Sequence, residues 1–460
     1  MKNTRHRILP LSPLAALAFA AVGAIAQQKA PAPAPEIDLQ DGDTFVFLGD
    51  SITHQCLYTQ YIEDFFYTRY PDRKLHFHNA GVSGDKAADA LARFDDDVAA
   101  YRPKHVSILL GMNDGQYEPF SPEVFATYAD GMTEILDRIG RTGAKALVMS
   151  PTMFDHHQLG LRMKDETYRF RERSFDPHYN SLLAYYAGWL RETAGARGLS
   201  FINQWGPMND VTFDTRIAQP DFSLVPDAIH PGAAGQFLMA FELVRQATPD
   251  RKAVSAIGIT PRANGKWIAG KEVADLEVSP GADRVTFTHT ASALPWVVPA
   301  EAFTDPQKWE AEPAADLAYR FTAAGHKLSN ERLKVAGLAP GNYAVTIDGV
   351  EVGRYSHLAL GAKVELQANA RTPQYRQALD VATLNRERND KAMRPLRDLW
   401  GQVKGLRRKH ASDPEKFAAE YAALQPRLDE LKTLAADHET RIHQAAQPQP
   451  RKYEIARVPE

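Results

Sequence analysis

The strongest constraint on the fold is a regular alternation of short apolar segments with longer amphipathic ones over residues 42–247. Five short segments are rich in β-branched or aromatic residues, and they read TFVFLG, KLHFHNAG, HVSILLGMND, AKALVMSP and LSFINQW. Apolar residues recur at helical spacing between and after them, over residues 55–69, 85–100, 122–140, 177–196 and 232–246. Strands that alternate with helices predict a mostly parallel sheet with helices on both faces. Ligands of such sheets bind beyond the C-terminal ends of the strands.

The sequence changes character after this α/β region. Residues 251–371 carry strand and turn signals without helical patterns, as in DRVTFTHT and APGNYAVTIDGVEVGRYS, and predict a small antiparallel β-sandwich. Residues 372–460 are interpreted as a highly charged helical extension that ends in a tail, AAQPQPRKYEIARVPE. Within the extension, an apolar stripe predicts a helical hairpin packed on the rest, and it consists of Leu424, Leu428, Leu431 and Leu434. The α/β domain itself is assigned to residues 42–250.

The N-terminus has the features of a signal peptide. Residues 1–26 combine a basic start, an apolar middle and the small-residue site Ala24-Ile25-Ala26. A membrane anchor is the alternative, but the apolar run is short and is interrupted by Pro10 and Pro13. We therefore predict export to the periplasm or the cell exterior, with no stable membrane insertion after cleavage. Residues 27–41 form a Pro-rich linker.

Charge and cysteine content exclude several classes of protein. The formal net charge is -3 and no basic block or stripe is present, which argues against a nucleic-acid partner. Cys56 is the only cysteine, so no internal disulfide is expected and a large hydrophobic core must hold the fold together. We interpret Cys56 as a small apolar filler on the first helix. The histidine spacings do not match a metal-binding pattern, so neither a metal nor another cofactor is expected.

The segment GDSIT places Ser51 where the first strand gives way to a helix. Backbone N–H groups at a helix N-terminus are unpaired and can stabilise negative charge. In the simpler interpretation, Asp50, Ser51 and Thr53 only cap this helix. Which interpretation applies depends on the polar residues elsewhere in the chain.

Three further polar segments lie where strands or loops reach the same edge of the sheet. Gly81 lies in NAGVSGD, Asn113 in GMND, and Asp227 with His230 in DAIHP. A serine hydroxyl needs an adjacent base, and histidine has an unperturbed pKa near ~6.5. Asp227 can hold the imidazole of His230 in the required tautomer. The backbone N–H groups of Ser51 and Gly81 and the Asn113 amide would then form an oxyanion hole.

Together these four segments resemble the motifs of the SGNH (GDSL-type) hydrolase family, in the family's order. The resemblance implies a flavodoxin-like three-layer α/β/α fold and hydrolysis of carboxylic esters through an acyl-serine intermediate. It implies Ser51 as nucleophile, His230 as general base and Asp227 as the residue that orients His230, without a metal. Asp50 resembles the family's buried structural acid.

The connection over residues 151–180 is long, and long loops at this edge are often substrate-facing. Candidate substrate-binding residues are His54, Phe154, His156 and His157, although a solvated insertion without a substrate role is equally compatible with the sequence. By analogy with exported carbohydrate esterases, we expect an O-acetylesterase of carbohydrates or polysaccharides. The alternatives are a lipase- or thioesterase-like acyl hydrolase and a noncatalytic glycan-binding protein on a hydrolase scaffold. The β-rich region would brace the α/β domain or bind sugar, and the sequence does not determine the oligomeric state.

Overall fold

The computed structural model describes residues 36–164, 175–248, 252–298 and 315–459. The predicted signal peptide and the first part of the Pro-rich linker lie outside the described residues. Within the described part of the chain, no helix is both long and apolar enough to cross a lipid bilayer.

The first domain is built on a parallel five-stranded sheet with the order β2-β1-β3-β4-β5. The strands are β1 (Thr44–Gly49), β2 (His76–Gly81), β3 (His105–Leu109), β4 (Lys145–Met149) and β5 (Ser200–Ile202). Gly49 lies opposite both Gly81 and Leu109, so the C-terminal ends of the three strands are level. All five strands coincide with the apolar segments of the sequence, and the residues that follow β1, β2 and β3 therefore meet at one edge.

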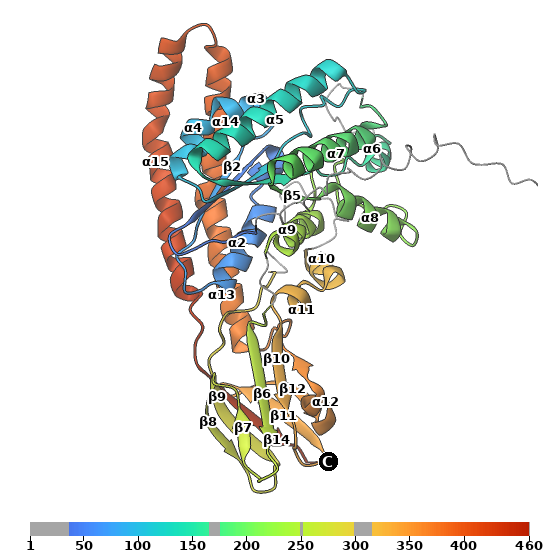
Figure 1. The fold of residues 1–460 in the computed structure, drawn as a ribbon, viewed down its shortest axis with the longest axis vertical. Helices are drawn as coiled ribbons and strands as arrows, with labels where there is room; N and C mark the ends of the chain where they lie inside the picture. Colours follow the sequence, from blue (N-terminus) through green and yellow to red (C-terminus); the bar gives the residue numbers. More distant parts are fainter. Residues whose placement is uncertain (1–35, 165–174, 249–251, 299–314, 460) are drawn as a thin grey trace, which may run out of the picture.

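Helices cover both faces of this sheet (Figure 1). One face carries α2 (Tyr58–Arg69) and α9 (Ala233–Ala247), which pack against each other. The opposite face carries α3 (Ala87–Ala92), α5 (Pro122–Thr142) and α7 (Tyr179–Arg197). This arrangement confirms the predicted three-layer α/β/α architecture. Four short elements and one longer helix were not resolved by the sequence pattern, namely α1 (Ser51–His54), α4 (Phe94–Asp97), a 3₁₀ turn (Ala99–Tyr101), α6 (His156–Arg162) and α8 (Trp205–Arg216).

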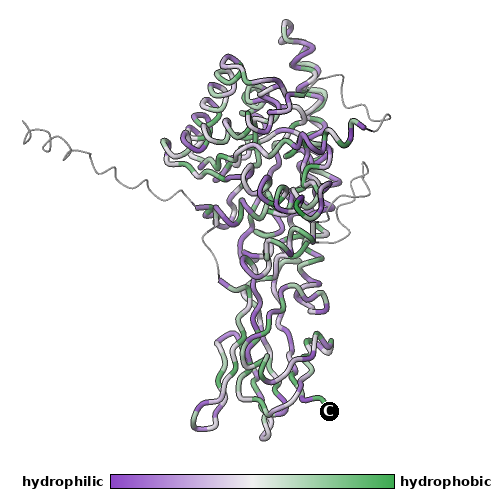
Figure 2. The backbone as a smooth tube through the Cα atoms, turned by 90° about the vertical axis from the view of Figure 1, so that its right-hand side faces the viewer, coloured by the Kyte–Doolittle hydropathy of each residue, from purple (hydrophilic) through white to green (hydrophobic). Residues whose placement is uncertain are grey.

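A β-sandwich with its own hydrophobic core extends the α/β domain at one end (Figures 1 and 2). Its sheets have the orders β13-β10-β6-β7 and β12-β11-β14-β9-β8. The strands are β6 (Ser255–Pro261), β7 (Trp267–Ala269), β8 (Val273–Val278), β9 (Arg284–His289), β10 (Glu331–Val335), β11 (Asn342–Ile347), β12 (Val350–Ser356), β13 (Val364–Glu365) and β14 (Arg451–Arg457). Three short helices lie between these strands in the sequence, α10 (Ala315–Thr322), α11 (Ala324–Leu328) and α12 (His357–Ala362). α10 and α11 contribute to the core of the α/β domain, and α12 to that of the sandwich.

Two details of the sandwich correct the sequence interpretation. β10 pairs with β6 in parallel, so the sandwich is not wholly antiparallel. The segment interpreted as a C-terminal tail forms β14, which lies between β11 and β9 in the middle of a sheet. Alternate residues of β14, Tyr453 and Ile455, are buried in the sandwich core. The chain therefore returns to the sandwich after the helical extension, and the tail prediction was wrong.

The helical extension consists of α13 (Pro373–Arg388), a π-helical turn (Asn389–Met393), α14 (Arg394–Lys409) and α15 (Pro414–Ala445). Figure 1 shows α14 and α15 as a long hairpin that runs beside the parallel sheet. Leu428 and Leu431 are buried and Leu424 and Leu434 are partly buried, which confirms the predicted hairpin. The same apolar cluster includes Cys56 and Val82, so the hairpin shares a core with the α/β domain. Cys56 fills this core as predicted, but it lies in the turn between α1 and α2 and not on a helix, and burial raises the pKa of its thiol to about 12.

Candidate active site

Ser51 is the first residue of α1, immediately beyond the end of β1. Asp50 caps the helix, because its Oδ1 accepts a hydrogen bond from the Ile52 N–H at 3.0 Å. Gly49 permits the tight turn, since a Cβ there would lie 2.1 Å from Thr53 Oγ1. Burial raises the pKa of Asp50 to about 7, although the Ile52 N–H and the nearby His230 favour its charged form. The same turn therefore realises the capping interpretation for Asp50 and leaves Ser51 only partly buried.

His230 and Asp227 lie in the loop before α9 and face Ser51. His230 Nε2 is 2.9 Å from Ser51 Oγ, and His230 Nδ1 is 2.6 Å from Asp227 Oδ2. The other carboxylate oxygen of Asp227 accepts the backbone N–H groups of Ile229 and His230. Burial alone would raise the pKa of Asp227, but the bonds to His230 lower it below its usual value. Because Asp227 remains ionised, it can hold a proton on Nδ1 and leave Nε2 free to accept one from Ser51.

Asp155, which the sequence analysis did not single out, fixes the loop that carries this pair. Its backbone N–H donates to Ala228 O at 2.9 Å, and its carboxylate accepts from Ser223 Oγ at 2.6 Å. Arg216 donates to the same carboxylate oxygen at 2.5 Å. Asp155 is buried and caps α6, so these bonds tie the loop between α8 and α9 to the N-terminus of α6.

Asn113 follows β3 and points its amide toward the turn that carries Ser51. Its Nδ2 donates to Asp85 O at 3.1 Å and to Asp50 Oδ2 at 3.3 Å. Its Oδ1 accepts a hydrogen bond from the Tyr117 hydroxyl at 3.1 Å, which fixes the orientation of the amide. Gln116 and Tyr117 both have positive φ angles, 62° and 63°, which are costly for side chains of this size. No pattern in the sequence indicated that Tyr117 would fold back onto Asn113.

The structure contradicts the oxyanion role predicted for Gly81. The Gly81 N–H donates to Asn79 Oδ1 at 2.8 Å and is therefore already paired. Glycine is required there for packing, since a Cβ would lie 2.3 Å from the backbone nitrogen of His54. Three residues further on, Gly84 has a φ of +69°, and within the described chain its N–H has no hydrogen-bond acceptor. The Ser51 N–H is likewise without an acceptor in the described part of the protein.

The four predicted substrate-binding residues occupy different environments. His54 lies on α1 beside Ser83, and its ring is mostly buried. Phe154 is fully buried among Tyr117, Phe175 and Tyr179, so it is part of the core and does not form a substrate-facing surface. His156 and His157 are exposed on the first turn of α6. Residues 165–174 of the same long connection lie outside the described chain.

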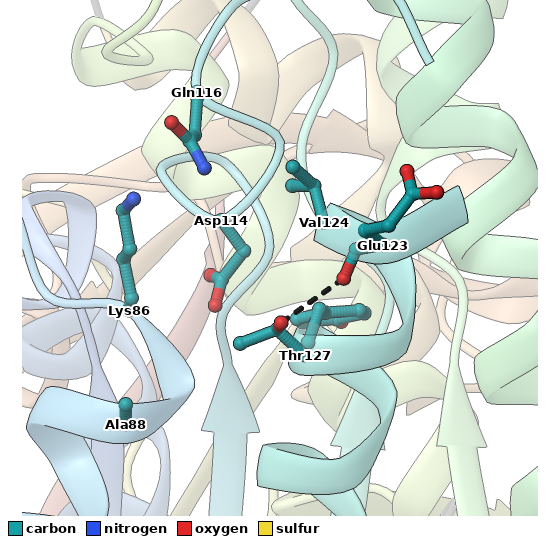
Figure 3. Close-up of a pocket in the computed structure, with 8 residues that line it drawn as sticks. Lys86, Ala88, Asp114, Gln116, Glu123, Val124 and Thr127 are labelled. Atoms are coloured by element: carbon teal, nitrogen blue, oxygen red, sulfur yellow. Dashed lines mark hydrogen bonds between the residues drawn. The ribbon is translucent and has the colours of Figure 1, made fainter. Parts of the chain in front are cut away.

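A cavity of about 200 Å³ lies beside the Asn113 turn (Figure 3). Asp114 projects into it from the turn after β3 and faces Lys86 across the opening. One carboxylate oxygen of Asp114 accepts the Ala87 N–H at 2.8 Å, and burial raises the pKa of Asp114 to about 6. The lining residues are Lys86, Ala88, Asp114, Gln116, Glu123, Val124, Thr127 and Tyr128. Among the residues described, no group of three or more histidine, cysteine or acidic side chains is arranged to hold a metal ion.

A serine, a histidine and an aspartate joined by consecutive hydrogen bonds, at the C-terminal edge of a parallel sheet, form the arrangement used by serine hydrolases. Residues 47–238 match the sequence profile of the GDSL-like Lipase/Acylhydrolase family. The chain carries a domain of this family, which confirms the resemblance to SGNH hydrolases, and it is a carboxylic ester hydrolase.

The chain is similar to an acetylxylan esterase of Geobacillus stearothermophilus, with 24% identity over 224 residues that cover 45% of this chain and 94% of the relative. A solved structure of a gut microbial diltiazem-metabolizing enzyme matches 93% of this chain and all of that one, with a TM-score of 0.75 and 21% identity. A crystal structure of a catalytic mutant of the Geobacillus stearothermophilus acetylxylan esterase covers 46% of this chain, at 22% identity and a TM-score of 0.38. The match to the diltiazem-metabolizing enzyme shows that the arrangement of α/β domain, β-sandwich and helical hairpin recurs in another protein.

Proposed function

We propose that Ser51 is the nucleophile of this ester hydrolase, with His230 as its general base and Asp227 as the residue that orients His230. The observation that carries the proposal is the unbroken chain of short contacts from Ser51 Oγ through the imidazole to Asp227 Oδ2. Ser51 Oγ attacks the ester carbonyl while its proton passes to His230 Nε2. The imidazolium returns that proton to the leaving alkoxide, and an acyl-serine remains. Water, deprotonated by the same imidazole, then releases the acid and restores Ser51.

The oxyanion of the tetrahedral intermediate would be stabilised by three donors: the backbone N–H groups of Ser51 and Gly84 and the Asn113 amide. The two N–H groups are supported by their lack of acceptors within the described residues. Asn113 is supported by the Tyr117 bond that turns its Nδ2 toward the nucleophile. Loss of one such donor costs about 2.7–4 kcal/mol of transition-state stabilisation. The contacts of Asn113 to Asp50 and Asp85 are long enough for a substrate oxyanion to replace one of them.

We further propose that the substrate is an O-acetylated carbohydrate and that the protein acts after export. The similarity to an acetylxylan esterase supports the acyl group and the substrate class. The basic, apolar and Ala-x-Ala segments of residues 1–26 support export. His156 and His157, exposed at the start of α6, are suited to hydrogen bonding with sugar hydroxyls.

Hydrolysis of matched substrates tests this proposal. We expect acetate release from acetylated xylo-oligosaccharides and a rate that falls from p-nitrophenyl acetate to butyrate to octanoate. Ser51→Ala should lower turnover of each substrate by about 10⁴-fold or more, with an unchanged melting temperature. A preference for octanoate would instead identify a lipase-like acyl hydrolase. Full activity of Ser51→Ala would contradict the nucleophile assignment.

A further inference from the structure

Ser83, Gly84 and Asp85 lie just beyond the end of β2, and we refer to them as the β2 loop. The two residues that flank Gly84 are held mainly by side chains from outside the loop, among them His54 and, from the helical extension, Lys404. We propose that α14 completes the active site, with Lys404 and Asp398 as positioning residues that hold the β2 loop so that the Gly84 N–H points at the oxyanion. The inference rests on the proposed function, because it assigns a purpose to the Gly84 N–H.

Lys404 forms hydrogen bonds with the β2 loop on both sides of Gly84. Its Nζ donates to Asp85 Oδ1 at 2.8 Å and to Ser83 O at 3.2 Å. Apart from the neighbouring residues of the chain, Lys404 Nζ is the one described atom within 4 Å of the position that a Gly84 Cβ would occupy, at 3.8 Å. The Lys404 side chain is only 11% exposed, and Asp85 is fully buried. A charge pair this well shielded from water is screened less than a surface pair, so it can define the position of a short loop.

Asp398 holds the same loop through His54. The backbone N–H of Ser83 lies 3.2 Å from His54 Nδ1 and can only donate, so Nδ1 must accept. The ring proton of neutral His54 is therefore on Nε2, which donates to Asp398 Oδ1 at 3.1 Å. Burial lowers the pKa of His54, which favours this neutral form over the charged one that Asp398 would promote. His54, predicted as a substrate contact, thus links α14 to the β2 loop.

A buried second set of contacts ties α14 to the strands that end at the active site. Arg397 donates two bonds to Asp97, at 2.7 and 2.9 Å, and Asp97 also accepts from Arg93 at 2.6 Å. Arg93 in turn donates to Ala80 O and Gly49 O, the carbonyls at the ends of β2 and β1, and pairs with Asp85. Arg394 adds a bond to Gln55 O at the end of α1.

These residues share one face of α14, because positions 394, 397, 398, 401, 404 and 408 recur at helical spacing. Next to this face, Trp400 and Val403 belong to the apolar cluster that α14 shares with α15. A helix that only braced the domain would need the apolar contacts with Val82 and Cys56 and no polar contacts with the β2 loop. Two side chains of α14 instead reach the loop, Lys404 directly and Asp398 through His54, as a positioning role requires.

Lys404→Met removes the hydrogen bonds to Ser83 and Asp85 with little change in side-chain volume, and Lys404→Arg keeps the charge. Lys409→Met, on the same helix but bonded to Glu420 of α15, is the matched control. With p-nitrophenyl acetate, Lys404→Met should lower kcat by about 10-fold with KM nearly unchanged, and loss of the buried pair with Asp85 should also lower the melting temperature. Its affinity for a boronic acid that forms a tetrahedral adduct should fall by the same factor. Lys404→Arg should recover most of the activity, and Lys409→Met should match the wild type.

Asp398→Asn is a second test in case Lys404→Met does not fold, because the Asp398 side chain is 70% exposed. This variant should lower kcat by about 3-fold. The positioning role is overturned if Lys404→Met folds and keeps kcat within 2-fold. It is also overturned if KM rises while kcat stays constant. Failure of the proposed function gives a different result, because Ser51→Ala would then keep its activity whatever the behaviour of the α14 variants.

Discussion

The hairpin of α14 and α15 and the β-sandwich are both additions to the same α/β domain, but they are attached in different ways. The hairpin shares an apolar core with Cys56 and Val82, and it is joined by buried ion pairs. The sandwich has a separate core. Among the described residues, no hydrogen bond joins a sandwich strand to Ser51, His54 or the β2 loop. The difference suggests that the hairpin supports catalysis and that the sandwich braces the domain or serves another purpose.

The largest expected effect is the difference in stability lost when a buried ion pair of the hairpin or an exposed ion pair within the sandwich is removed. Arg397→Met removes a guanidinium that is completely buried against Asp97, and we expect the free energy of unfolding to fall by about 3 kcal/mol. This loss of stability is at the lower end of that expected for a broken buried ion pair, because Arg93 still pairs with Asp97. Arg284→Met in the sandwich removes a pair with Glu454 that is largely exposed, and should cost less than about 1 kcal/mol. Urea unfolding of both variants measures the comparison, and equal losses would contradict it.

The sandwich buries a carboxyl group, that of Glu331, whose contribution to stability depends on pH. Burial raises the pKa of Glu331, at the start of β10, to about 7. A raised carboxyl pKa means that the folded state holds its proton more tightly than the unfolded state. Glu331 therefore contributes stability that is present below about pH 4 and lost as the pH rises through 7. Relative to the wild type, Glu331→Gln should gain up to ~3 kcal/mol between pH 4 and pH 8.

Asp50 beside Ser51 provides the matched comparison, since its pKa is also raised to about 7 by burial. Asp50→Asn should show the same gain in stability with pH, measured by urea unfolding at several pH values. It should also lower kcat, because Asp50 caps the helix that starts at Ser51 and accepts from Asn113. Glu331→Gln should leave kcat unchanged. A pH-independent difference in either variant would show that the carboxyl is not protonated in the folded protein near neutral pH.

The smallest effect on kcat is expected from the removal of a tyrosine hydroxyl, compared between the α/β domain and the sandwich. Tyr117→Phe removes the bond to Asn113 Oδ1 and should lower kcat by about 5-fold, the equivalent of one hydrogen bond of ~1 kcal/mol. Tyr343→Phe in the sandwich removes bonds to Ala282 O and Ala339 O and should leave kcat unchanged. Steady-state kinetics with p-nitrophenyl acetate distinguishes them. A loss of kcat in Tyr343→Phe would show that the sandwich is coupled to catalysis after all.

The sequence predicts the parallel sheet well because each strand is a local apolar segment flanked by a helical one. It also predicts Ser51, Asn113, Asp227 and His230, because strand ends of a parallel sheet must meet at one edge. β14 could not be predicted, since its partners β9 and β11 lie more than 100 residues earlier in the chain.

The face of α14 that reaches the β2 loop was also beyond prediction. Arg397, Asp398 and Lys404 belong to a highly charged helix, and such residues ordinarily face water. Only the fold shows that Arg397 is buried and that Lys404 is nearly so. Gly81 was chosen for the oxyanion hole because it lies at a strand end, and the Asn79 side chain that occupies its N–H is visible only in three dimensions.

Covalent trapping of the nucleophile is the most direct test of this account. Treatment with a p-nitrophenyl phosphonate ester should add one phosphonyl group to the protein, and peptide mass spectrometry should locate it on Ser51. His230→Ala should slow the labelling strongly, because its imidazole lies 2.9 Å from Ser51 Oγ, and Ser51→Ala should abolish it. Labelling of a different residue, together with continued ester hydrolysis by Ser51→Ala, would contradict the assignment of the active site.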